Sequence, residues 1–176
     1  TNASGLMVVH TTGATIGDDA GVFQNNLGMN RQFSSLSLTK IRLPTVANTR
    51  VFVGFTDQTL ASMVGADNPA GNYFGLQKRA ADTNWFWTQR NNVTTTRSDT
   101  TIAIDTTVKF MRTDFRGGTG ILFQLFNSTF TFQSVFNGAA NQPLSTVQMR
   151  FVCGVETQTG AARSIEHGYT YLIGAT

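Results

Sequence analysis

The sequence has 176 residues, which is long enough for one domain that buries its own core without a disulfide or metal staple. Its residues are 40% hydrophobic and only 13% charged, which excludes an intrinsically disordered chain and indicates a surface of Thr, Ser, Asn and Gln, as in many extracellular and virion β-proteins. The net charge is +3, but the cations are scattered singly along the chain, so the pattern argues against nucleic-acid binding.

Short runs of β-branched and aromatic residues recur along the chain between polar or glycine-containing breaks, and helical periodicity is almost absent. Alternation is clearest where Val51, Val53 and Phe55 share one face, and where Phe130 and Phe132 share another. This pattern predicts an all-β fold of two packed antiparallel sheets. The predicted strands are 6–10, 36–43, 50–56, 73–79, 85–89, 101–104, 107–113, 121–126, 129–136, 148–156 and 169–173.

Turn signals separate these strands. The segments 66–72 and 115–120 contain the glycine and proline punctuation of loops, and Asn137-Gly138 is a turn dipeptide. No shift in composition divides the chain, so we predict a single domain over 1–176, with 1–32 as an N-terminal strand and a connection to a preceding shaft. No apolar stretch reaches the roughly 20 residues of a transmembrane helix, and we expect no membrane insertion.

Residues that would carry enzyme chemistry are sparse. The two glutamates, Glu156 and Glu166, fall on different predicted elements, whereas glycosidases need two carboxylates that face each other. His10 and His167 lack the spacing of a zinc site and are expected to be solvated or singly hydrogen-bonded, and Cys153 lies in an apolar run as a buried thiol. We therefore predict no enzyme and no cofactor, and we assign no metal site, although Asp and Asn oxygens in loops such as 66–72 leave calcium binding open.

The aromatic segment at 85–87 offers a binding hypothesis. Trp85 and Trp87 share one face of a predicted strand, and Trp85 is expected in the core. Trp87 is nearer the polar run that follows, where a partly exposed ring can stack on a sugar while neighbouring side chains hydrogen-bond its hydroxyls. The predicted ligand-binding residues are Trp87, Arg90, Asn91 and Asn92, together with Asp67, Asn68 and Tyr73.

The order of three segments carries a resemblance. RVFVGFTD at 50–57, DTNWFWTQR at 82–90 and GVETQTG at 154–160 resemble a concanavalin-A-like jelly-roll domain of bacteriophage tail-fibre and virion spike proteins. The resemblance covers roughly Phe33 to Thr176. The chain departs from the pattern in the last strand, where Gly168 stands before Tyr169 in place of an expected Asp.

The resemblance implies a lectin-like sandwich, often a homotrimeric head, that attaches a virion to a host glycan or another receptor. On that basis we expect a non-enzymatic attachment domain on an extracellular virion, with host carbohydrate and other virion proteins as partners. Two alternatives stay open. One is a structural capsid or fibre jelly roll that contacts only virion proteins, and the other is a polysaccharide depolymerase.

Overall fold

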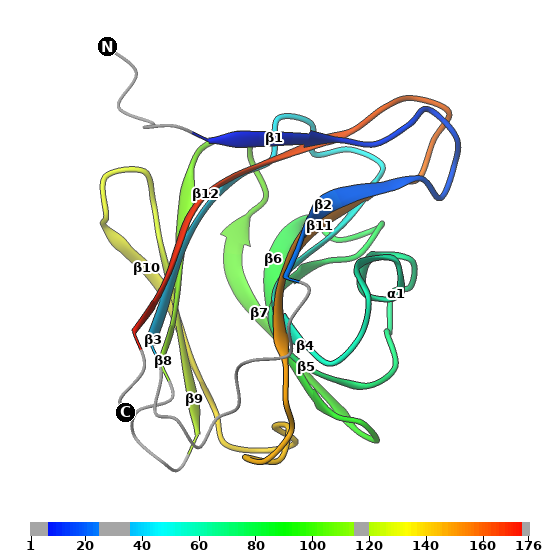
Figure 1. Ribbon diagram of the computed structural model, residues 1–176. Coiled ribbons are helices and arrows are strands. Elements are labelled where there is room, and N and C mark those ends of the chain that lie inside the picture. Colours follow the sequence, from blue (N-terminus) through cyan, green and yellow to red (C-terminus); the bar gives the residue numbers. More distant parts are fainter. Residues whose placement is uncertain (1–6, 25–35, 115–119, 174–176) are drawn as a thin grey trace.

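The computed structural model describes residues 7–24, 36–114 and 120–173, and it shows two antiparallel sheets packed face to face (Figure 1). Each sheet has six strands. The predicted all-β sandwich is therefore confirmed.

The chain passes from one sheet to the other with successive strands near both of its ends, so that strands from the two ends pair in each sheet. Sheet A has, in spatial order, β1 (Val8–Thr11), β12 (Ser164–Ile173), β3 (Leu36–Arg42), β8 (Lys109–Asp114), β9 (Ile121–Phe126) and β10 (Phe132–Gly138). Sheet B has β2 (Asp19–Phe23), β11 (Arg150–Thr157), β4 (Thr49–Thr56), β5 (Asn72–Lys78), β6 (Asn84–Asn91) and β7 (Thr95–Ala103). This winding is that of a jelly roll.

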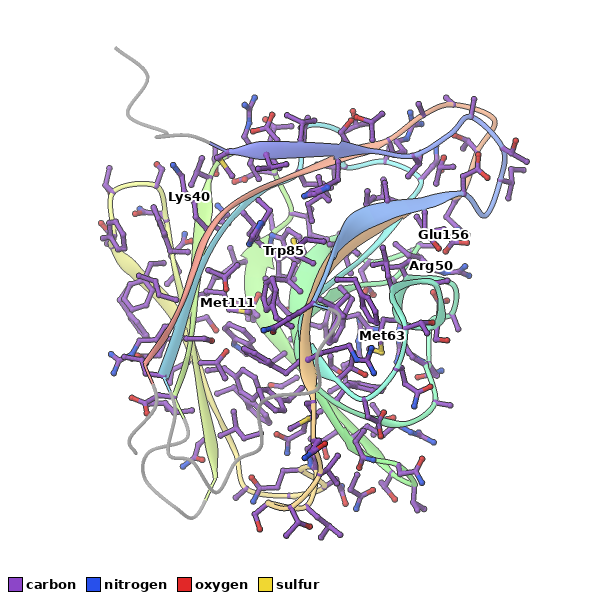
Figure 2. The ribbon with its side chains drawn as sticks, viewed as in Figure 1. Lys40, Arg50, Met63, Trp85, Met111 and Glu156 are labelled. Atoms are coloured by element: carbon purple, nitrogen blue, oxygen red, sulfur yellow. The ribbon has the colours of Figure 1, made fainter. Side chains whose placement is uncertain are left out.

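The core lies between the sheets and follows the predicted alternation. Val51, Val53 and Phe55 of β4 point inward, and they meet Trp85 of β6 and Met111 of β8 in one cluster of buried side chains. Figure 2 shows Trp85 and Met111 in the space between the two sheets. The inward positions of β4, β6 and β8 therefore hold the sandwich together through burial of apolar surface.

A short helix that the sequence did not reveal, α1 (Leu60–Val64), covers part of the outer face of sheet B. The Thr59 side chain caps its first turn by accepting from the Ser62 amide, and Met63 packs under the helix against Phe52 and Tyr73 (Figure 2). At Gly154, a Cβ atom would lie 2.1 Å from Leu60 Cδ1, so glycine permits this close approach. The helix packs on β2, β11 and β4, away from the outer faces of β6 and β7.

Other differences also separate prediction from structure. Strand β12 begins at Ser164 rather than near residue 169, and Asn137 and Gly138, predicted as a turn, are the last residues of β10. Strand β2 was not predicted, and β7 begins at Thr95 rather than near residue 101. Phe130 does not belong to β10, because its φ of 60° places it in the turn before that strand. Most of the predicted loop at 115–120 lies outside the described residues, as do the first residues of the predicted N-terminal strand. Over the three described ranges, no helix is long and apolar enough to cross a membrane.

Candidate functional site

Polar and charged side chains gather on the outer face of sheet B beside the loop that follows α1. They come from β11, β4, β5, β6 and β7 and from the loops that join them, and they form a connected set of hydrogen bonds and ion pairs. We call this set the sheet B cluster. Its members are Arg50, Asp67, Asn68, Gln77, Arg79, Asp82, Phe86, Arg97 and Glu156.

Arg97 of β7 is fixed from three sides. Its guanidinium carbon lies 3.5 Å from the centroid of the Phe86 ring on the neighbouring strand, a cation–π contact. Its Nε donates to Gln77 Oε1 at 3.2 Å, and Nη2 pairs with the Asp82 carboxylate. Burial lowers the pKa of Arg97, although Asp82 opposes this effect, and an arginine stays charged at neutral pH. The result is a cation held in a defined position on the sheet.

Asp82 owes its position to the turn between β5 and β6. Its Oδ2 accepts from the backbone amide of Arg79 at 2.7 Å, which closes the turn, and the same carboxylate pairs with Arg97. The DTNW segment is thus a turn that leads into β6. That turn also places a carboxylate in the cluster, a second role that no motif predicted.

Arg50 of β4 joins two carboxylates that are distant in the chain. Its Nε donates to Asp67 Oδ1 at 2.8 Å, and its Nη1 donates to Glu156 Oε2 at 3.2 Å. Glu156 stands opposite Arg50 in the pairing of β11 with β4, so the strand register brings these two together. Figure 2 shows both side chains on the α1 side of sheet B.

The charge of Asp67 is stabilised by this arrangement. Burial alone would raise the pKa of Asp67, but the hydrogen bond and positive charge of Arg50 outweigh it and hold the pKa below its ordinary value. Asp67 is therefore ionised at neutral pH. Because its side chain is still 45% exposed, it can accept hydrogen bonds from a ligand.

Gln77 links the two halves of the cluster. Its Nε2 donates to the backbone carbonyl of Asp67 at 3.2 Å, and its Oε1 accepts from Arg97. Asn68, which is exposed, accepts from Arg79 Nη2. The donors and acceptors of the cluster are consequently oriented before any ligand arrives, which reduces the entropy lost on binding.

The structure divides the predicted binding residues into two groups. Asp67 and Asn68 belong to the sheet B cluster. Arg90, Asn91 and Asn92 lie at the opposite end of β6, about 13 Å along the strand from Phe86. There Arg90 donates to Thr95 Oγ1 and to the Asn92 carbonyl, and Asn91 Oδ1 accepts from two backbone amides of the turn. That either group contacts a ligand stays a prediction.

Two residues that were predicted to contact a ligand, Trp87 and Tyr73, are buried, so this part of the prediction is wrong. Trp87 is 1% exposed, not partly exposed, and its indole stacks on Phe123 of sheet A with ring centroids 5.2 Å apart. Tyr73 is 0% exposed beneath α1. The polar run after Trp87 is misleading because β6 continues to Asn91 and keeps the Gln89 side chain buried in the sandwich. Neither aromatic ring can stack on a sugar in this structure.

The remaining reactive side chains form no catalytic set in the described ranges. Cys153 is buried, and burial raises the pKa of its thiol, which agrees with the prediction of an inert side chain. His10 and His167, predicted to be solvated or singly hydrogen-bonded, are both partly buried. They face each other across β1 and β12 with ring centroids 6.5 Å apart. Among the described residues, no group of three or more His, Cys, Asp or Glu could hold a metal ion.

Comparisons with known proteins found a similarity of fold but no similarity of sequence that identifies a family. No protein-family model matches the sequence. No curated protein matches it either. Similar solved structures include an endo-β-1,4-glucuronan lyase from the fungus Trichoderma reesei (TM-score 0.62, 10% identity), which aligns over 97% of this chain and 81% of its own.

Two further structures match comparably. One comes from work on endo-acting O-glycanases of human gut bacteria that initiate mucin breakdown (TM-score 0.65, 10% identity, 97% and 80% of the two chains). The other is a β-1,3-glucanase from Mycobacterium marinum (TM-score 0.63, 10% identity, 95% and 74%).

These names contradict the prediction that the chain is not an enzyme, because they belong to proteins that cleave glycan chains. At such low identity the likeness shows the fold and assigns no reaction. It also gives no support to a phage tail-fibre origin in particular. What the comparisons establish is that the chain has the concanavalin-A-like jelly-roll fold shared by glucanases, lyases and O-glycanases.

Proposed function

We propose that this protein recognises a polysaccharide on the outer face of sheet B, along β5, β6 and β7. The observation that carries the proposal is the fixed position of Arg97, which lies over Phe86 and is hydrogen-bonded to Gln77 and Asp82. A sugar chain presents many hydroxyl groups and few charges. It is best recognised by several oriented donors and acceptors on a preformed surface.

The groups around Arg97 suit that task. Asp67 is an ionised acceptor that is partly open to solvent, and Asn68 and Asp99 are exposed on either side of Gln77 and Arg97. The Asn84 side-chain amide is oriented by both oxygens of Asp99. Because α1 covers the β2, β11 and β4 part of this face, an extended chain would lie on the remaining part, along β5, β6 and β7.

Replacing Arg97 with Ala should weaken polysaccharide binding at least tenfold, which corresponds to about 1.4 kcal/mol. The change removes the cation and leaves Asp82 and Gln77 without their shared partner. The measurement is calorimetric or surface-based titration with soluble β-1,3-glucan, glucuronan and mucin glycans. These are the glycan classes mentioned in the names of the similar structures.

Arg112→Ala is the matched control, because Arg112 is also paired with an aspartate, Asp114, but lies on the outer face of sheet A. It should leave the affinity unchanged. Equal losses in both variants would show that the site is not on sheet B. Failure of the wild-type protein to bind any of the glycans would count against polysaccharide recognition itself.

Cleavage of the bound glycan is a second candidate function, favoured by one feature of the cluster. Asp67 and Glu156 approach the same guanidinium, that of Arg50, so two carboxylates lie near each other at the α1 edge of the proposed binding face, Asp67 with a side chain 45% exposed and Glu156 with one 7% exposed. Two neighbouring carboxylates are what most glycoside hydrolases use. Incubation with each bound polymer should then release reducing ends, and Glu156→Gln should abolish that release while binding persists. A bound polymer that yields no new chain ends would refute cleavage.

A virion surface is the biological setting that we propose for this recognition. The support comes from the segments 50–57, 82–90 and 154–160 and from the low charge of the chain. Several copies on one particle would raise the effective concentration of each site, so weak individual contacts would be sufficient for attachment. Binding of the purified protein to intact candidate host cells, competed by the soluble glycan, tests this setting separately.

A further inference from the structure

Aromatic side chains also gather on the outer face of sheet A, far from the sheet B cluster. Phe130 is 56% exposed, Phe132 50% and Val135 53%, although large apolar side chains are normally more buried. Phe110 stacks on Phe130, and Phe126, which pairs with Phe110 across β8 and β9, contacts Phe132 edge to face. Val135 lies on the same side of β10 as Phe132, so the five lie on one outer face. We call these five residues the phenylalanine face.

The sequence around this face carries no charge. From Gly117 to Met149 it contains no Asp, Glu, Lys, Arg or His, and this stretch includes all of β9 and β10. Strand β10 is the last strand of sheet A, and exposed end strands usually carry charges that prevent association. The end strand of sheet B follows that rule, since β7 contains Arg97 and Asp99. Strand β10 has a bulge between Phe132 and Ser134 but no charge.

The backbone holds Phe130 on this surface at some cost. Its φ of 60° is in the left-handed region, which costs a non-glycine residue about 1–3 kcal/mol. The Asn127 side chain fixes the turn by accepting from the amides of Thr129 and Thr131. The ring is thereby placed over Phe110, with centroids 3.9 Å apart, while more than half of the residue stays exposed. Strain of this kind is found where a surface has a role.

Charges of both signs lie along one side of the phenylalanine face, on β12, β3 and β8. The Lys40 ammonium lies 5.9 Å from the centre of the Phe110 ring, on the outer side of sheet A (Figure 2). Arg112 pairs with Asp114 at 2.8 Å, and Arg42 pairs with Glu166 at 3.2 Å. An uncharged centre with a mixed rim is the usual composition of a protein interface.

We propose that the phenylalanine face binds the same face of a second copy of this chain, related by a two-fold axis. An identical copy meets no like-charge repulsion at the centre, and its rim offers carboxylates to the lysine and arginines of the first. Phe130, Phe132 and Val135 expose roughly 250–300 Å² together, if a phenylalanine offers about 200 Å². Even with the rim this is less than the roughly 800 Å² per partner that a standard stable interface buries, so we expect a weak dimer that dissociates on dilution.

The test is the mass of the purified protein across a concentration series, by analytical ultracentrifugation. The wild-type protein should be a dimer that dissociates on dilution. The double variant Phe132→Lys and Val135→Lys should be monomeric, with self-association weakened at least 100-fold. Val93→Lys is the control, since Val93 is 76% exposed in the turn between β6 and β7, and it should stay dimeric. Circular dichroism and the melting temperature confirm that each variant is folded.

A second pair of variants shows that the contact is between like faces. Phe132→Glu with Val135→Glu should also be monomeric alone, and mixing it with the lysine variant should restore dimers through opposite charges. A wild-type monomer at every concentration, a trimer, or a dimer that survives both double substitutions would each overturn the proposal. So would a monomer whose phenylalanine face is covered by a different protein. Glycan binding is measured separately, so neither result depends on the sheet B site.

Discussion

Replacing Trp87 with Ala should lower the free energy of unfolding by about 3–5 kcal/mol, the range typical of a buried Trp or Phe truncated to Ala. The indole stacks on Phe123 of the opposite sheet at 5.2 Å, and its Nε1 donates to Ser134 Oγ of β10 at 3.4 Å. Removing it leaves a cavity at the contact between the sheets. For a chain of this length the melting temperature should fall by roughly 6–20 °C.

Urea denaturation followed by circular dichroism measures this effect. Val93→Ala is the control, because that side chain is 76% exposed and its loss should change stability by less than about 0.5 kcal/mol. Glycan binding by the folded fraction of Trp87→Ala should be unchanged. A stable variant that has lost glycan binding would restore the sequence-based prediction that Trp87 contacts a sugar.

The architecture followed from the sequence wherever one face of a strand is apolar. Strand β9 was predicted with its observed bounds, because Ile121, Phe123 and Leu125 alternate with side chains that face outward. Strand β7 was largely missed because both of its faces are polar. The buried Thr100 side chain donates a hydrogen bond to the Trp85 carbonyl. Such a bond leaves no pattern of alternating hydropathy in the sequence, so it could not be predicted.

The candidate site was harder to predict from the sequence, because its residues are brought together only by the register of the strands. Arg50 and Glu156 are paired across β4 and β11, and Arg97 reaches Asp82 and Gln77 across a hairpin. Sequence alone named Glu156 as an isolated acid. Of the predicted ligand-binding residues, Asp67 and Asn68 lie in the sheet B cluster, in a loop that its proline and glycine had already identified, and their contact with a ligand stays a prediction.

The two histidines, also distant in the sequence, should make the protein less stable in mild acid. Burial and the neighbouring His10 lower the pKa of His167 from 6.5 to about 4, and burial also lowers the pKa of His10. His167 lies against Phe151 as well, with ring centroids 5.5 Å apart, so a second charge there would be poorly solvated. The folded state therefore resists protonation that the unfolded chain accepts.

The direction of the change in stability with pH follows from the number of protons that the folded and unfolded chains bind. Between the folded and unfolded pKa values the unfolded chain binds more protons, so the stability that is complete above about pH 6.5 is lost as the pH falls toward 4. His167 alone should cost about 2 kcal/mol between about pH 7 and pH 5, or roughly 4–8 °C in melting temperature. Most carboxylates stay ionised over that range, so they contribute little. Thermal melts at both pH values measure the difference, and His167→Gln should remove most of it. An equal pH dependence in the wild-type protein and the variant would show that another group is responsible.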